Sequence, residues 1–148
     1  EDLRDTVHEQ VERAISDGAV AEAGGHTVDR RGFFYRPTVL TEVERGTVAF
    51  EEEIFGPVAS LIVAEDVGEA VGLANDSRFG LGASVFTEDR DQGERIARRL
   101  EAGCVFVNEM VKSDPRLPFG GVKDSGYGRE LAGHGIREFV NVKTVWVE

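Results

Sequence analysis

Five apolar residues stand at helical spacing near the start of the chain: Leu3, Val7, Val11, Ala14 and Ile15. Polar residues separate them, which predicts an amphipathic helix over residues 3–15 that ends at Gly18. A short strand is expected at residues 20–23. A second strand is expected in RPTVLTEV, residues 36–43, where Pro37 lies at the start and its missing backbone donor is tolerated.

The middle of the chain alternates apolar runs with helical patterns. Strands are expected at residues 58–64, 81–87 and 104–108, with helices at 66–75 and 89–102 between them. The strands begin about 23 residues apart, a spacing that accommodates a crossover helix. The pattern predicts an α/β fold in which two right-handed crossover units build a parallel sheet.

The composition changes after the third of these strands. Residues 109–128 are rich in proline, glycine and charge, and a loop of about twenty residues is more often functional than passive. A short helix is expected near residues 129–135, and an apolar strand at 139–147. This last strand either joins the local sheet or pairs with another subunit, and the second is favoured because no later element covers it. One face of the strand would carry Val140, Val142, Thr144 and Trp146.

The composition indicates a folded protein without a membrane span. The chain has 148 residues, of which 41% are hydrophobic, so it can form one domain or a large part of a bigger one. No apolar run approaches the roughly 20 residues of a membrane helix, and the N-terminus does not resemble a signal peptide. Cys104 is the single cysteine, which suits a reducing compartment, and we expect a cytoplasmic location.

The charge balance is strongly acidic. Asp and Glu number 28 against 17 Lys and Arg, a formal net charge of −11, which disfavours nucleic acids and anionic membranes as partners. Only three of the basic residues are lysines, and arginine supplies the other 14. Acid excess with scarce lysine favours the hypothesis of adaptation to concentrated salt, where screening weakens self-repulsion.

The stretch FEEEIFGPV, residues 50–58, sets three glutamates directly before an Ile-Phe-Gly-Pro turn. The Gly-Pro pair is expected to keep the chain extended, so that Glu53 and Phe55 project to one side while Ile54 faces the core. A carboxylate two residues from an aromatic ring can accept both hydroxyls of a sugar diol. The residues alone favour a plainer interpretation, with solvated glutamates and Phe55 in the core, because acidic runs are common on so acidic a chain.

Other candidate residues carry weaker signals. Cys104 lies in an apolar strand without a nearby His or Lys, so a structural role is favoured over a nucleophilic one. The three histidines lack metal-ligand spacing, and no metal site is expected. The glycines of GGVKDSGYG do not match a phosphate-binding loop. Ser113, Arg116 and Phe119 fit a pocket mouth or an ordinary surface loop equally well.

Six segments together resemble the C-terminal portion of the NAD(P)-dependent aldehyde dehydrogenases. In chain order they are GFFYRPTVL, EEEIFGPV, NDSRFGLGASVFT, AGCVFVN, LPFGGVKDSGYGREL and VNVKTVWV. The resemblance extends over essentially the whole chain. Within that family, NEMVKSDPRLPFGGVKDSGYGREL is most similar to the succinate-semialdehyde dehydrogenases. The family resemblance implies that residues 1–138 are part of a Rossmann-like catalytic domain and that residues 139–148 are an oligomerisation strand.

The resemblance also implies roles for five residues. Glu53 would hydrogen-bond the nicotinamide ribose of NAD or NADP, and Phe55 would pack beside it. Leu81 would lie near the nicotinamide, although a hydrophobic residue there also fits any core. Phe119 would form an aromatic wall of the aldehyde pocket, and Ser113 would help to bind the distal carboxylate of succinate semialdehyde.

The same resemblance implies that the catalytic nucleophile, the general base and the dinucleotide-binding domain precede the region covered by this chain. No catalytic residue is therefore assigned, Cys104 matches a variable position, and the chain alone is expected to be inactive. Assembly through residues 139–147 would give dimers or tetramers. Two alternatives stay open: another aldehyde substrate within the family, or a non-catalytic module that only self-associates or binds a partner.

Overall fold

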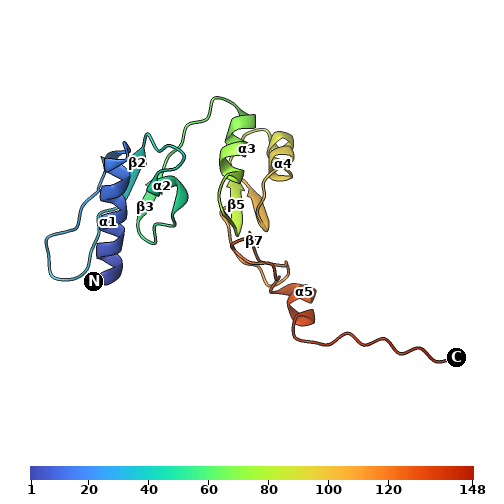
Figure 1. Cartoon of the computed structure of the whole chain (residues 1–148). Coiled ribbons are helices and arrows are strands. Elements are labelled where there is room, and N and C mark those ends of the chain that lie inside the picture. Colours follow the sequence, from blue (N-terminus) through green and yellow to red (C-terminus); the bar gives the residue numbers. More distant parts are fainter. The chain divides into compact units, whose positions relative to one another are not determined.

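The computed structural model describes residues 1–148, and the chain divides into two compact units, Glu1–Ala64 and Glu65–Glu148 (Figure 1). They are called the first unit and the second unit. Both combine helices with short strands, which confirms the α/β class predicted from the sequence. No helix in either unit is both long enough and apolar enough to cross a membrane.

The first unit is a helix packed against a three-stranded sheet. Helix α1 (Asp2–Ser16) leads into β1 (Val20–Ala23), and β1 pairs antiparallel with β2 (Thr38–Thr41). Strand β2 pairs parallel with β3 (Val58–Ser60), and between these two strands lies a single turn of helix, α2 (Val48–Glu51). The helix and the strand expected at the start of the chain are therefore confirmed, whereas α2 was not predicted.

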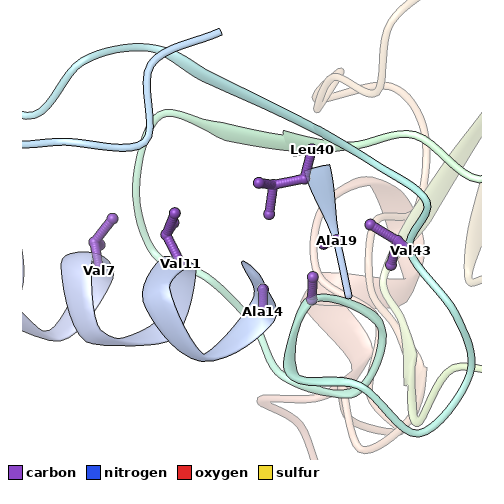
Figure 2. Packing of buried hydrophobic residues seen from close by; sticks show 7 residues of the cluster. Val7, Val11, Ala14, Ala19, Leu40 and Val43 are labelled. Atoms are coloured by element: carbon purple, nitrogen blue, oxygen red, sulfur yellow. The ribbon is translucent and has the colours of Figure 1, made fainter. Parts of the chain in front are cut away.

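The core of this unit lies between α1 and the sheet. Figure 2 shows side chains of α1 directed toward Leu40 of β2. Val11 and Leu40 are completely buried, and burying a side chain of this size stabilises a fold by about 1.5–3 kcal/mol. The seven buried members of the cluster are Val7, Val11, Ala14, Ala19, Leu40, Val43 and Ala49.

The second unit contains a complete crossover unit. Strand β5 (Gly82–Val85) pairs parallel with β6 (Cys104–Val107), and helix α4 (Arg90–Ala97) connects them. The preceding helix, α3 (Val67–Asn75), begins at Asp66, whose carboxylate accepts a hydrogen bond from the backbone of Glu69. The second of the two predicted crossover units is therefore present.

The other predicted crossover is wrong. Strand β3 pairs with β2 inside the first unit, and β5 pairs with β6 inside the second. The strand predicted over residues 58–64 also ends early, because β2 has only four residues and its last bond to this segment goes from the Leu61 N–H to the Leu40 carbonyl. The apolar run predicted the strand, but a local pattern does not specify which strand it pairs with.

Several predicted boundaries move inward. The second strand occupies Thr38–Thr41 and not residues 36–43, β5 occupies Gly82–Val85 and not 81–87, and α4 stops at Ala97. The last helix, α5, spans Ala132–Arg137 and begins three residues later than expected. Residues 109–128 are not entirely loop, because they contain β7.

Strand β7 (Val122–Lys123) pairs antiparallel with β4 (Phe79–Gly80). Each strand has two residues, and more than forty residues separate them along the chain. No local sequence pattern indicates a ladder this short. The pairing fixes the glycine-rich loop after Phe119 against β4, directly before β5.

Residues 139–147 form no strand within this chain. Figure 1 draws them as extended chain after α5. Large apolar side chains are exposed along the segment, with Val142 at 85% and Trp146 at 84%. Of the two alternatives for this segment, joining the local sheet is wrong, and pairing with another subunit stays a prediction.

Candidate functional site

The segment after α2 presents one acid and one aromatic ring to the outside. Ile54 is partly buried against the core of the first unit, whereas Glu53 is exposed and Phe55 is 69% exposed. This confirms the predicted alternation and excludes Phe55 as a core residue. The Glu53 carboxylate has no hydrogen-bond or ion-pair partner within the chain, so its oxygens are free to accept bonds from a ligand.

Glu51 and Glu52 are not simply solvated acids, contrary to the plainer sequence interpretation. A Glu51 carboxylate oxygen accepts a hydrogen bond from the Gly46 N–H at 3.1 Å. Glu52 accepts bonds from Gln10 at 3.0 Å and from Arg13 at 3.1 Å, and the Gln10 bond is the main cause that lowers the pKa of Glu52. The three neighbouring glutamates therefore have three different environments, and only Glu53 is left without a partner.

The Gly-Pro turn after Phe55 lies directly on α1. A Cβ at Gly56 would come within 2.7 Å of a Val7 methyl group, so a larger residue would push the segment off the helix. The Gly56 N–H donates to the Ile54 carbonyl at 2.8 Å, and the Val58 N–H donates to the Gly56 carbonyl at 2.8 Å. Close packing and these bonds hold the turn in place between the exposed ring and β3.

A cavity of about 400 Å³ adjoins the exposed ring within the first unit. Four of its ten lining residues are aromatic, and one of them, Phe33, is 61% exposed. Its aromatic members are Phe33, Phe34, Tyr35 and Phe55. Glu1 and Arg4 also line the cavity and Glu53 does not, so its aromatic part offers a surface against which a flat ring can pack.

In the second unit, Leu81 and Phe119 line the same cavity, whose volume is about 400 Å³. The family resemblance assigns Leu81 to the coenzyme side and Phe119 to the substrate side, and the two lie 38 positions apart in the chain. Arg129, Glu130 and Phe139 contribute to the same lining. The structure thus brings together two of the three candidate residues in this unit.

The loop that carries Phe119 is fixed by its backbone. The Phe119 N–H donates to the Glu130 carbonyl at 2.9 Å, and the Glu130 N–H donates to the Phe119 carbonyl at 2.8 Å. The Arg129 guanidinium donates to the carbonyls of Gly121 and Gly128 at 2.7 and 2.8 Å. A cavity wall held by four such bonds needs little ordering when a ligand enters.

Glycines allow this loop to approach β6. A Cβ added at Gly103 would overlap the carbonyl oxygen of Gly120, and one at Gly120 would overlap that of Gly128. The obstacle in both cases is backbone, which cannot swing aside as a side chain can. The glycine cluster therefore serves close backbone packing, as the sequence favoured, and it positions the ring of Phe119.

Ser113 does not line the Leu81–Phe119 cavity and lies on an exposed stretch of the same loop region. Ion pairs flank it on both sides. The Lys112 ammonium lies 2.7 Å from Glu109, and Arg116 donates through two nitrogens to Asp114. The hydrogen bond from Arg116 is the main cause that lowers the pKa of Asp114, so this carboxylate stays charged beside Ser113.

The Cys104 side chain is partly buried, and its thiol donates to the Leu81 carbonyl at 3.2 Å. No group of three or more His, Cys, Asp or Glu side chains is arranged to hold a metal ion. The candidate residues are Glu53 and Phe55 in the first unit, and Leu81 and Phe119, which line one cavity, in the second.

Sequence reasoning missed Gln10. It is only 9% exposed and sits on the face of α1 that carries Val7, Val11 and Ala14. A signal was present, because Gln10 lies three positions after Val7 and four before Ala14, where a polar residue interrupts the apolar stripe of the helix. A buried amide needs hydrogen-bond partners, and the partners of Gln10 are the Glu52 carboxylate and the main-chain carbonyl of Glu53.

Comparison with known families identifies the class of protein. The model of the aldehyde dehydrogenase family matches residues 1–145. The chain therefore belongs to the aldehyde dehydrogenase family, as the sequence motifs indicated.

Two of the relatives that the chain matches are succinate-semialdehyde dehydrogenases. The chain is 50% identical over 147 residues to succinate-semialdehyde dehydrogenase [NADP(+)] 1 of Mycobacterium ulcerans (strain Agy99), covering 99% of this chain and 32% of the relative. It is 50% identical over 145 residues to succinate semialdehyde dehydrogenase [NAD(P)+] Sad of Escherichia coli (strain K12), covering 98% of this chain and 31% of that enzyme.

A solved structure gives the same picture. The succinic semialdehyde dehydrogenase of Streptococcus pyogenes, in complex with NADP+ as the cofactor, superposes with a TM-score of 0.95 at 36% identity. The match covers 99% of this chain and 32% of that one. The chain spans about a third of the length of the relatives that it matches.

Proposed function

We propose that the chain is the C-terminal part of an NAD(P)-dependent aldehyde dehydrogenase that oxidises succinate semialdehyde to succinate. The observation that carries the proposal is the unpartnered Glu53 carboxylate, two residues from the exposed ring of Phe55. The resemblance to succinate-semialdehyde dehydrogenases at about 50% identity supports the choice of substrate.

The residues of the first unit fit a nicotinamide coenzyme. Glu53 would accept hydrogen bonds from the ribose hydroxyls, and Phe55 would cover the adjoining part of the coenzyme. The family resemblance also assigns Leu81 a place near the nicotinamide. The coenzyme, NAD or NADP, accepts a hydride from the substrate when bound.

The second unit would contribute to the aldehyde pocket. Phe119 would form an apolar wall, and the Ser113 hydroxyl would donate to the distal carboxylate of the substrate. The nucleophile and general base of the reaction would come from parts of the complete enzyme outside these residues. Residues 1–148 by themselves would therefore be inactive.

The role of Glu53 is tested by Glu53→Gln in the complete enzyme. The amide keeps the shape but loses the charge that strengthens its bonds to the hydroxyls, so NADP+ or NAD+ should bind about 10- to 100-fold more weakly. Glu51→Gln is the matched control, and it should bind as the parent does. Calorimetry measures both affinities, and equal affinity of Glu53→Gln and parent would contradict the proposed coenzyme role.

The substrate assignment is tested by comparing kcat/KM for succinate semialdehyde and for an uncharged aldehyde of equal length. We expect the charged substrate to be preferred, and Ser113→Ala to reduce that preference about 3- to 10-fold by raising KM for succinate semialdehyde alone. A preference for the uncharged aldehyde would point to another substrate within the same family.

A further inference from the structure

Helix α1 contacts the glutamate run, residues 51–53, through the side chain of Gln10. Gln10 lies on the buried face of α1, and its side-chain amide donates from one nitrogen to two acceptors. The first is a Glu52 carboxylate oxygen at 3.0 Å, and the second is the main-chain carbonyl of Glu53 at 3.3 Å. A neutral amide has two N–H groups on that nitrogen, so it can satisfy both acceptors without burying a charge.

The Glu52 carboxylate is held through both of its oxygens. While Gln10 bonds one oxygen, Arg13 Nη2 lies 3.1 Å from the other. Gln10 and Arg13 are three residues apart, so they project from neighbouring turns on one side of α1. Helix α1 therefore binds the segment at the Glu52 side chain, directly before Glu53.

The extended backbone after Glu52 couples the orientation of Glu52 to the orientations of Glu53 and Phe55. Glu52 has extended backbone angles, φ −100° and ψ 148°, so side chains alternate from one side of the segment to the other. Glu52 faces α1 and Ile54 packs against the core, two residues apart on the inner side. Glu53 and Phe55 must then point outward, and a rotation of Glu52 would turn both of them.

We propose that Gln10, acting through Glu52 and the Glu53 carbonyl, is a positioning residue that aims the Glu53 carboxylate at the coenzyme. The inference rests on the proposed function, because it takes Glu53 as the ribose-binding group. It adds a residue that lies 43 positions before Glu53 in the chain and acts through it.

The test uses Gln10→Met in the complete enzyme, because methionine has a similar volume and no hydrogen-bond donor. NADP+ affinity is measured by calorimetry, and the melting temperature is measured without coenzyme. We expect affinity to fall about 3- to 10-fold, while KM for the aldehyde changes less than twofold. Glu51→Ala removes a neighbouring carboxylate that does not contact Gln10, and it should leave NADP+ affinity unchanged.

The double variant Gln10→Met/Glu53→Gln separates positioning from general support of the fold. If Gln10 acts through Glu53, the double variant should bind NADP+ no more weakly than Glu53→Gln alone. Multiplying losses would overturn the inference and assign Gln10 a structural role. Should Gln10→Met alter the melting temperature, Glu52→Ala provides the same test from the exposed side of the contact, with the same expected loss and the same double variant.

The outcomes also separate this inference from the proposed function. Weaker binding in Glu53→Gln with parental binding in both Gln10→Met and Glu52→Ala would refute the positioning role and leave Glu53 as the coenzyme ligand. Parental binding in Glu53→Gln would overturn both.

Discussion

Phe119 and Glu130 exchange two backbone hydrogen bonds, at 2.9 and 2.8 Å, so the ring of Phe119 is carried by a closed loop and not by a free one. Within the loop, Gly120 packs against the Gly128 carbonyl, and the Arg129 guanidinium donates to the carbonyls of Gly121 and Gly128. The wall of the Leu81–Phe119 cavity is therefore formed before any ligand binds. The stability of the loop and the shape of the cavity should respond together to substitution.

Arg129→Ala tests the clamp inside this loop. The guanidinium bonds to Gly121 and Gly128 would be lost, leaving carbonyls without their partner, and we expect a loss of about 1–3 kcal/mol in the free energy of unfolding. Arg98→Ala is the control, because Arg98 forms only an exposed ion pair with Glu94 and should cost less than about 0.5 kcal/mol. Thermal unfolding of both variants decides it, and equal effects would contradict the clamp.

Gly103→Ala tests the backbone contact between the loop and β6. The added methyl group would overlap the Gly120 carbonyl oxygen, so we expect destabilisation of about 3 kcal/mol or more. Gly72→Ala is the matched substitution, since Gly72 lies inside α3 with open space around it, and alanine there should stabilise by about 0.5–1 kcal/mol. Opposite signs in denaturant unfolding are expected, and a neutral Gly103→Ala would refute the close approach.

Val142→Lys tests the assembly proposed for residues 139–147. A charge on the apolar face of a strand that pairs with another subunit should weaken that pairing, so the complete enzyme should dissociate into smaller species. Asn141→Lys adds the same charge on the opposite face and serves as the control. Light scattering measures the mass of each variant, and an unchanged mass for Val142→Lys would argue against this interface.

The sequence predicted the elements whose pattern is local. Helix α1 follows from an apolar stripe, and the paired strands β5 and β6 follow from apolar runs separated by a helical segment. Strand β3 was recognised as a strand but given the wrong neighbour, since pairing depends on contacts between distant segments. The two-residue strands β4 and β7 have no local pattern at all.

For the candidate site, the sequence predicted the outward direction of Glu53 and Phe55, because a side-chain period of two follows from extended backbone. It did not predict that Glu52 is bound by Gln10, because no spacing rule connects residues 42 positions apart. Ser113 was assigned by resemblance alone, and its exposed position outside the Leu81–Phe119 cavity leaves that role a prediction.

The extended segment after α5 has a consequence for the order in which the protein acquires its structure. Its backbone donors and acceptors find no ladder within the chain, while Trp146 and Val147 remain more than four-fifths exposed. Under the proposed pairing, this segment becomes ordered only when two chains meet. Its ordering is then a second-order process whose rate rises with protein concentration.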